Sequence, residues 1–361
     1  MPTLFTPLTV GTLEVPNRIF LAPLTRCRAE AGDVPGDLIA THYAQRASGG
    51  LLIAEATMAI AGNCAFYGAP GVHSDAQVAG WRKVTDAVHA KGGRIYLQIW
   101  HGGRACHSAL NGGAQPVSAS AIAIDGETYT PTGMQRYDTP RELRDDEIPA
   151  VVAGFRKAAE NAKRAGFDGV EVHGANGYLL DQFLRDGSNK RSGPYGGAIA
   201  NRARLLLEVV DAVASVFGAG RVGVRVSPLN SYNSMLDSDP VALTTYVATE
   251  LSKRGIGYLH LMRADFYGKQ HGDVLTPARR GFKGTLVANM GYTPDEAEFA
   301  VSTGLVDAVA FGTAFLANPD LPERIKTKAP LNTPDQSTFY TQGAKGYTDY
   351  PTLVETAPVR A

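Results

Sequence analysis

Short runs of apolar residues, rich in β-branched and aromatic side chains, alternate along this chain with longer amphipathic stretches. The short runs have the length and composition of buried strands, and they lie at Arg18–Ala22, Leu51–Glu55, Arg94–Ile99, Gly169–His173, Val222–Ser227, Tyr258–Met262, Thr285–Ala288 and Ala308–Phe311. The longer stretches carry apolar residues at helical spacing, and they lie at Asp75–Ala90, Asp146–Ala165, Asn201–Phe217, Pro240–Arg254 and Pro294–Thr303.

Strands that alternate with helices indicate a parallel sheet. Eight such units in 361 residues fit an α/β fold of the (β/α)8 TIM-barrel type, which usually takes roughly 250 residues plus insertions. We therefore predict that residues 1–361 form a single barrel domain. A doubly wound sheet is the alternative, but it normally has a glycine-rich turn after its first strand. The GxGxxG match at Gly218–Gly223 follows a predicted helix and precedes a strand, the reverse of the dinucleotide fingerprint, and is interpreted as a helix-terminating turn.

Three segments do not fit the repeat. Residues Met1–Asn17 have the pattern of a β-hairpin, which we expect to plug the bottom of the barrel. Residues His101–Glu142 are rich in Gly, Ser and Ala and lack helical periodicity. They predict a long loop after the third strand, and such loops are usually functional or mobile. Residues Pro330–Pro351 are unusually aromatic, and we expect this segment to fold back over the barrel.

Composition narrows the class of protein. Hydrophobic residues make up 44% of the chain and charged residues 19%, with a formal net charge of zero, so nothing favours nucleic acid or an anionic membrane as partner. No apolar run in the sequence approaches the roughly 18 residues of a membrane span. Cys27, Cys64 and Cys106 form no CxxC pair, and the N-terminus lacks signal-peptide features. These features predict a cytoplasmic protein in a reducing compartment, as a monomer or a homodimer.

The predicted carboxyl ends of the strands, where a barrel has its active site, are unusually polar. Each of these side chains taken singly has a structural explanation, such as a buried ion pair or a core contact. Together they predict a wide cavity with a polar rim, built from Pro23, Leu24, Thr25, Ala56, Gln98, Trp100, His173 and Arg225.

The segment His173-Gly174-Ala175-Asn176-Gly177-Tyr178 follows the fourth strand and opens a helix-like run, Leu179–Leu184. On one helical turn, residues three apart point the same way with Cβ atoms about 5–6 Å apart, so His173 and Asn176 can donate hydrogen bonds to one oxygen. Tyr178 lies about 200° further around the helix and would approach from another side. Two donors and a phenolic proton source predict chemistry on a polarised double bond. A satisfied His and a helix-capping Asn are the structural alternative.

The loops after the last two strands predict a phosphate site. They read Asn289-Met290-Gly291 and Gly312-Thr313, and small residues let backbone N–H groups approach an anion. Thr293-Pro294-Asp295-Glu296 has the composition of a helix start. The sixth strand ends in Met262-Arg263, without a lysine for a Schiff base, and no cluster in the sequence has metal-ligand spacing. A phosphate site beside a flat polar cavity favours flavin mononucleotide (FMN) as the cofactor.

These residues match a known family. The chain resembles the Old Yellow Enzyme family of FMN-dependent ene-reductases over essentially its whole length, close to the bacterial N-ethylmaleimide-reductase-like branch. The similarity rests on NRIFLAPLTRCRA, HYAQRASGGLLIAEAT, QIWHGGR, AGFDGVEVHGANGYLLDQFLRDGSNKRSGPYGG, FLANPDL and KGYTDYP. It implies non-covalent FMN, NADPH or NADH as hydride donor, and ping-pong reduction of the activated C=C bond of α,β-unsaturated carbonyl compounds. Enones, maleimides or nitro-compounds would be the small-molecule partners.

The resemblance also implies a role for each site residue. Thr25, which marks the classical members, would bind the flavin C4 carbonyl. Gln98 would bind the pyrimidine edge, and Arg225 would stabilise the anionic reduced flavin. His173 and Asn176 would hold the substrate carbonyl as it becomes an enolate, and Tyr178 would protonate the α-carbon. Further cofactor contacts would be Pro23, Leu24, Ala56, His173, Asn289, Met290, Gly291, Gly312 and Thr313, and the substrate pocket would include Tyr67, Trp100 and Tyr347.

The chain departs from the family pattern at the phosphate site. The strand-eight motif of the family usually reads Gly-Arg, with the arginine on the FMN phosphate, and here it reads Gly312-Thr313. Met290 stands where the family usually has glycine. We expect FMN to bind less tightly than in a Gly-Arg relative, with the Thr313 hydroxyl, backbone amides and Arg279 or Lys283 as partial replacements.

The sequence leaves two other functions open. A phosphate-binding lyase or isomerase would need a base at a strand end, and Glu55 and Glu171 are the strand carboxylates. A redox-sensing flavoprotein would use Cys27, although flavin storage needs no proton donor such as Tyr178. A relative with an iron–sulfur cluster is excluded, because three scattered cysteines cannot hold a four-iron cluster.

Overall fold

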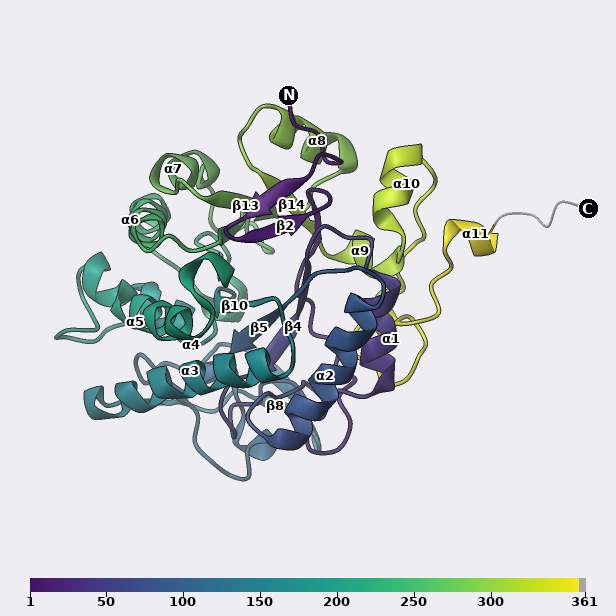
Figure 1. Ribbon diagram of the computed structural model, residues 1–361. Coiled ribbons are helices and arrows are strands. Elements are labelled where there is room, and N and C mark those ends of the chain that lie inside the picture. The colour runs from purple at the N-terminus through teal and green to yellow at the C-terminus, as the bar shows by residue number, and fades with distance from the viewer. Residues whose placement is uncertain (357–361) are drawn as a thin grey trace, which may run out of the picture.

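The computed structural model describes residues 1–356 and has a closed barrel of parallel strands at its centre (Figure 1). Around the barrel the strands pair in the order β10-β11-β12-β13-β14-β3-β4-β5, so β5 closes on β10. The predicted TIM barrel is confirmed, and each predicted strand is present with small differences at its ends. The strands are β3 (Ile19–Leu21), β4 (Leu52–Met58), β5 (Ile95–Trp100), β10 (Gly169–Gly174), β11 (Val222–Val226), β12 (Tyr258–Met262), β13 (Thr285–Asn289) and β14 (Ala308–Phe311).

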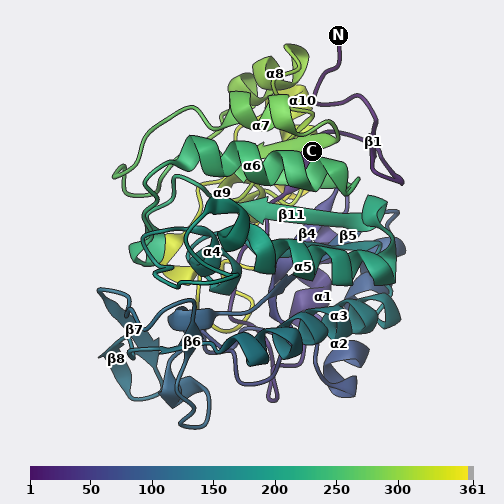
Figure 2. The ribbon, with the colours of Figure 1, turned by 90° about the vertical axis from the view of Figure 1, so that its left-hand side faces the viewer.

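Helices cover the outside of the barrel (Figure 2). The predicted ones are α2 (Asp75–His89), α3 (Ile148–Arg164), α4 (Leu179–Leu184), α5 (Ile199–Phe217), α6 (Pro240–Lys253) and α8 (Pro294–Ser302). Five short helices were missed, because so few turns show no clear period: α1 (Asp37–Gln45), α7 (Leu275–Gly281), α9 (Thr313–Ala317), α10 (Leu321–Thr327) and α11 (Leu353–Thr356). The GxGxxG stretch ends α5, with Gly218 at a φ of 81°, as predicted. Within residues 1–356 no helix has the length and apolar character needed to cross a membrane.

Large and small residues alternate inside the barrel. The Tyr258 ring lies over Gly223, where an added Cβ would be 2.1 Å from the ring, and the Tyr96 ring lies over Gly169 at 2.3 Å. The two tyrosine rings are 5.9 Å apart. Glycine at these two strand positions therefore leaves room for the tyrosine rings, which extend across the barrel and fill its interior, as layered packing of a barrel requires.

The N-terminal hairpin closes the bottom of the barrel, as predicted. It consists of β1 (Leu8–Val10) and β2 (Leu13–Val15), joined by a turn in which Gly11 has a φ of 59°. Val10, Leu13 and Val15 are buried, and they pack in one cluster with barrel residues such as Tyr96 and Tyr258. The backbone N–H of Thr12 donates to the carbonyl of Gly220, at 3.2 Å. Figure 2 shows β1 at the end of the barrel opposite to β7 and β8.

The segment after β5 has more structure than the predicted loop. It contains two 3-10 turns and four short strands, β6 (Val117–Ser118), β7 (Glu127–Thr130), β8 (Gly133–Arg136) and β9 (Arg141–Glu142). Strands β7 and β8 form a hairpin, and β6 pairs with β9. The long segment after the third strand is present as predicted, and its short strands were not foreseen because strands of two to four residues are too short to show alternation. The buried Arg104 ties the segment to the β11–α6 connection by donating to the carbonyl of Asn233, at 2.9 Å.

The C-terminal segment folds back over the barrel, as expected. Two arginines that follow β3 hold it through backbone carbonyls. Arg26 donates to the carbonyls of Phe339 and Gly346, at 3.0 and 2.8 Å, and Arg28 donates to that of Thr338, at 2.9 Å. Tyr347 is fully buried beneath both guanidinium groups. Buried guanidinium groups with this many carbonyl partners fix the segment in one position.

We predict that Leu13→Ala lowers the free energy of unfolding by about 2–3 kcal/mol, because it removes a buried side chain and leaves a cavity. Leu8→Ala, in the same hairpin but only partly buried, should cost less. The midpoints of urea unfolding of both variants compare the two costs. Equal midpoints would show that the hairpin is not part of the barrel core.

Candidate active site at the carboxyl end of the barrel

A cavity of about 350 Å³ lies at the carboxyl ends of β3 and β11 to β14. Its lining combines one cation, Arg225, with apolar side chains and the loops after β13 and β14. The lining residues are Ala22, Leu24, Arg225, Met262, Phe266, Asn289, Met290, Gly291, Tyr292, Ala310, Phe311, Gly312, Thr313 and Ala314.

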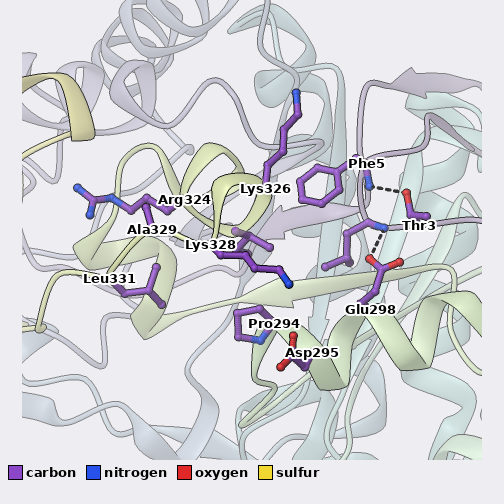
Figure 3. A pocket seen from close by; sticks show the side chains of 12 residues that line it. Thr3, Phe5, Pro294, Asp295, Glu298, Arg324, Lys326, Lys328, Ala329 and Leu331 are labelled. Atoms are coloured by element: carbon purple, nitrogen blue, oxygen red, sulfur yellow. Dashed lines mark hydrogen bonds between the residues drawn. The ribbon is translucent and has the colours of Figure 1, made fainter.

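A larger cavity, of about 500 Å³, lies elsewhere on the molecule (Figure 3). It is a groove between the N-terminal segment, α8 and α10, with acidic residues on one side and lysines on the other. Glu298 on its wall accepts the backbone N–H of Leu4, at 2.9 Å. None of the predicted site residues lines this groove, so we place the site at the strand ends.

The structure brings His173 and Tyr178 together, but not on a helical turn with Asn176. His173 belongs to β10, Asn176 has a left-handed φ of 59°, and α4 begins only at Leu179. The predicted single turn was therefore wrong. The left-handed residue reverses the chain, and the rings of His173 and Tyr178 meet edge to face with centroids 5.1 Å apart.

Asn176 is fixed on three sides by the β11–α6 connection. Its backbone N–H donates to Ser227 Oγ at 2.7 Å, and its carbonyl accepts from Asn233 Nδ2 at 2.9 Å. Its side-chain Oδ1 accepts from Asn230 Nδ2, also at 2.9 Å. Because the acceptor of the amide is used, the Nδ2 donor is left for a ligand. No motif in the sequence marks Asn230 and Asn233, which follow β11 in a loop with a short 3-10 turn.

Tyr178 lies in an aromatic corner with its hydroxyl free. Its ring packs edge to face on Trp100, with centroids 5.1 Å apart. Its hydroxyl makes no hydrogen bond with any described residue, and neither does the buried Trp100 Nε1. Burial, reinforced by the neighbouring Tyr232, raises the pKa of Tyr178 well above its usual value. The phenol is therefore protonated and able to donate.

A fully buried carboxylate, Glu171, organises the floor of the site. It accepts from Gln98 Nε2 at 2.7 Å, from the Tyr258 hydroxyl at 3.0 Å and from His260 Nδ1 at 2.9 Å. Burial opposes its ionisation, but His260, Arg225 and Gln98 outweigh burial and hold the pKa of Glu171 below its usual value. Glu171 is thus an anion with its oxygens occupied, and it is not the free base that a lyase needs. The bond uses the amide nitrogen of Gln98, and its carbonyl oxygen has no hydrogen-bond partner among the described residues.

Arg225 and His173 are adjacent on paired strands, β11 and β10. Both are buried, and the Arg225 side chain makes no hydrogen bond or ion pair in the described part of the chain. Burial, followed by the charge of Arg225, lowers the pKa of His173 well below its usual value, so the imidazole is neutral. Buried polar atoms here that lack a partner within residues 1–356 include Arg225 Nε and His173 Nδ1. Such unpaired groups in a folded protein indicate a ligand.

The remaining predicted cofactor contacts follow β3 and β4. Thr25 is half-buried, and its hydroxyl has no hydrogen-bond partner among the described residues. Ala56 lies in an irregularity of β4, between Ala54 and Thr57, where pairing with β5 shifts register; such bulges re-aim residues beside active sites. Pro23 is buried beside them. A flat polar ring with a phosphate tail, as in FMN, fits this set of unpaired donors, acceptors and small residues.

Two residues predicted for the substrate pocket have very different surroundings. Tyr67 is 69% exposed, and its neighbour Phe66 packs against Trp100 instead, with ring centroids 6.3 Å apart. Tyr347 is fully buried and stacks on His42, at 4.0 Å. Tyr340 stacks on Phe66, with ring centroids 6.1 Å apart. The sequence could not separate these aromatics, because neighbours in a loop differ only in the direction they face.

The phosphate end of the site differs from expectation in its cations. Arg279 pairs with Asp307 at 2.6 Å, at the amino end of β14, and Lys283 Nζ donates to the carbonyl of Arg280. Both lie at the far end of the barrel, so the expectation that they replace the missing arginine was wrong. The predicted helix start is confirmed, and Thr293 and Glu296 cap each other there, so the N–H groups of these two residues are already used.

The residues that a lyase or a redox sensor would need are not suited to those functions. Glu55 is fully buried, accepts the backbone N–H of Arg26 at 3.1 Å and does not line the cavity. Burial raises the pKa of Cys27 to about 12. A thiol with so high a pKa is inert at physiological pH, so Cys27 is no redox sensor.

These features define a class, that of a TIM barrel whose carboxyl end is built for a flavin and a polarised substrate. The family model of the NADH:flavin oxidoreductase / NADH oxidase family matches residues 3–332. The chain is 48% identical over 351 residues to a probable flavin mononucleotide-dependent alkene reductase of Leishmania infantum, covering 96% of each chain. It is 47% identical over 363 residues to 12-oxophytodienoate reductase 1 of Oryza sativa subsp. japonica, covering 98% of this chain and 93% of that protein.

Solved structures agree. Morphinone reductase superposes with a TM-score of 0.94 at 48% identity, covering 98% of this chain and 96% of its own, and a second structure of that protein holds tetrahydroNAD. The old yellow enzyme from Trypanosoma cruzi superposes with a TM-score of 0.95 at 43% identity, covering 97% and 99%. The chain belongs to the NADH:flavin oxidoreductase family, the Old Yellow Enzyme group. The predictions of an FMN-dependent ene-reductase and of the barrel fold are confirmed, and the lyase alternative is excluded.

We predict that Thr313→Arg tightens FMN binding, because it adds a charge-assisted contact worth about 1.5–3 kcal/mol, roughly tenfold to a hundredfold in Kd. Thr313 is exposed at the start of α9, so a longer side chain has room. Titration of the apoprotein with FMN, followed by quenching of flavin fluorescence, gives both Kd values. Equal values would show that the missing arginine does not matter.

Glu55 should make stability depend on pH. Burial raises its folded pKa to about 7, above the ordinary 4.5, so its contribution to stability is full below pH 4.5 and is lost as pH rises through 7. The free energy of unfolding should fall between pH 5 and pH 7.5 by an amount on the order of 2–3 kcal/mol more in the native chain than in Glu55→Gln. Urea unfolding at both pH values measures this difference, and parallel pH profiles would contradict it.

Proposed function

We propose that the whole chain acts as one FMN-binding barrel that reduces the activated C=C bond of α,β-unsaturated carbonyl compounds with hydride from NADPH or NADH. We further propose that it belongs to the bacterial N-ethylmaleimide-reductase-like branch and accepts enones, maleimides or nitro-compounds. One observation carries the proposal: neutral His173 lies between Tyr178, whose hydroxyl has no partner among the described residues, and Arg225, which lines the cavity and has no hydrogen bond or ion pair there. The Nδ2 donor of Asn176, three residues further on, is left for a ligand.

The cofactor would be held by groups that have no partner in the chain itself. Thr25, Gln98 and Arg225 would bind the polar edge of the flavin ring, Pro23, Leu24 and Ala56 would line the ring, and residues 289–291 and 312–313 would receive the phosphate. The Arg225 guanidinium favours negative charge on the ring, because the buried cation has no hydrogen bond or ion pair elsewhere in residues 1–356. FMN bound there would supply hydride transfer from the nicotinamide to the β-carbon of the substrate.

His173 and Asn176 polarise the substrate. The neutral imidazole has one N–H donor, and Asn176 offers Nδ2 because Asn230 occupies its Oδ1. Both donors would bind a carbonyl oxygen that gains negative charge as the β-carbon accepts hydride. They therefore bind the transition state more tightly than the ground state.

Tyr178 completes the reaction as proton donor. Its high pKa keeps the phenol protonated, and its free hydroxyl is held in place by the rings of Trp100 and His173. A proton passed from this hydroxyl to the α-carbon converts the enolate to the saturated carbonyl compound. The buried, free thiols of Cys27, Cys64 and Cys106 fit the reducing cytoplasm that the sequence predicts.

The test is the separation of the two half-reactions in Tyr178→Phe. Under anaerobic conditions, NADPH should bleach the flavin of the variant at the native rate. Reoxidation by 2-cyclohexenone should be slower by a factor of roughly 10² or more, the usual contribution of a general acid. Stopped-flow absorbance of bound flavin measures both steps, and Tyr246→Phe, a tyrosine on the outer helix α6, is the control. Equal slowing of both half-reactions would show that Tyr178 is not the proton donor.

A further inference from the structure

We propose that Arg263 is the positioning residue for the FMN phosphate in this chain, and that it takes over the task of the arginine missing at position 313. Arg263 does not touch the anion itself. It holds the loop of residues 290–292 from the side away from the cavity, so that backbone N–H groups of the loop face the anion. The proposal rests on the proposed function, since it requires that the chain binds FMN.

The clamp is visible in the contacts of the guanidinium. Arg263 follows β12, and its Nε donates to the carbonyl of Met290 at 2.9 Å while its Nη2 donates to that of Gly291 at 3.0 Å. The guanidinium also stacks on the Tyr292 ring, at 3.7 Å from its centroid, and Nη2 lies 3.4 Å from Glu296 Oε2. A planar fork that binds two successive carbonyls and a ring fixes all three residues of the loop.

The geometry of the peptide bond turns this clamp into an anion site. In a trans peptide the carbonyl and the following N–H point in opposite directions. Held by the carbonyls of Met290 and Gly291, the loop must direct the N–H groups of Gly291 and Tyr292 away from Arg263. Residues 290–292 line the cavity and Arg263 does not, so the cavity lies on the side to which these N–H groups turn. Neither N–H has a hydrogen-bond partner within the part of the chain that the structure describes.

The loop needs such a clamp because its backbone is strained. Met290 has a φ of 91°, a region that is strained for a residue other than glycine. A residue held there must be fixed by its surroundings, and the contacts of Arg263 to both sides of the Met290–Gly291 peptide supply this restraint. In this proposal Arg263 thus compensates for both departures from the family pattern, at Met290 and at Thr313.

Arg263 is also the cation best placed for this end of the cavity. Among the residues that line the cavity the cation is Arg225, which belongs to β11 beside His173, at the end assigned to the flavin ring. Arg279 lies at the opposite end of the barrel. A positive charge behind the loop further polarises the N–H groups that face the anion.

Comparison of FMN with riboflavin tests the clamp, because the two share a ring and differ in the phosphate. In Arg263→Gln the Kd for FMN should rise roughly tenfold or more, while the Kd for riboflavin stays within twofold of the native value. Addition of Thr313→Arg to this variant should restore FMN affinity, since a direct contact replaces the clamp. Arg263→Lys keeps the charge without the fork and should recover the FMN affinity only in part.

Arg279→Gln is the matched control. Arg279 also donates to two backbone carbonyls and pairs with one carboxylate, and it is 26% exposed against 27% for Arg263. This variant should leave the ratio of the two Kd values unchanged. The clamp is overturned if Arg263→Gln weakens FMN and riboflavin alike, or if Arg263→Lys binds FMN as the native chain does. A native chain that binds neither flavin would instead overturn the proposed function.

Discussion

The carboxylate of Glu171, buried in the middle of the barrel, is the constraint on which the site depends. A charge in this position is tolerable only with several partners, and Gln98, Tyr258 and His260 bind it from two sides of the barrel. Each of these contacts joins neighbouring or nearby strands. The need to pair this one anion therefore constrains how the strands align and how Gln98 is oriented. The same carboxylate is the counter-charge for Arg225.

Around this paired anion the site keeps other polar groups unpaired. Arg225 and His173 have buried nitrogen atoms without a partner in residues 1–356, and the Tyr178 hydroxyl makes no hydrogen bond with the described residues. Unsatisfied groups of this kind cost stability. The rigid barrel and the hairpin beneath it offset that cost, and the result is a cavity whose donors and acceptors are oriented before any ligand arrives. Asn230 contributes in the same way, because it uses the Asn176 acceptor and leaves the donor.

Loops that meet only in three dimensions complete the site. The β11–α6 connection supplies Ser227, Asn230 and Asn233 to Asn176, and Arg263 after β12 supports the loop after β13. Arg26 and Arg28 after β3 hold the C-terminal segment, which carries Tyr340 over Phe66. Each case uses a side chain from one strand end to orient the backbone or ring of another. Such support explains why catalytic side chains on loops can keep a fixed geometry.

The sequence by itself determined the barrel, the hairpin plug and the polar strand ends, because a strand or helix with one buried face has apolar residues at a regular local spacing. It also determined the family and the departure at Thr313, which are read from residues in order. The tertiary structure decided what depends on direction and distance across the barrel. It showed that Asn176 lies on a left-handed turn and not a helix, that Phe66 and not Tyr67 packs against Trp100, and that Arg263 and not Arg279 reaches the loop after β13. No local pattern encodes these choices, since they are made only when closure of the barrel brings separate loops together.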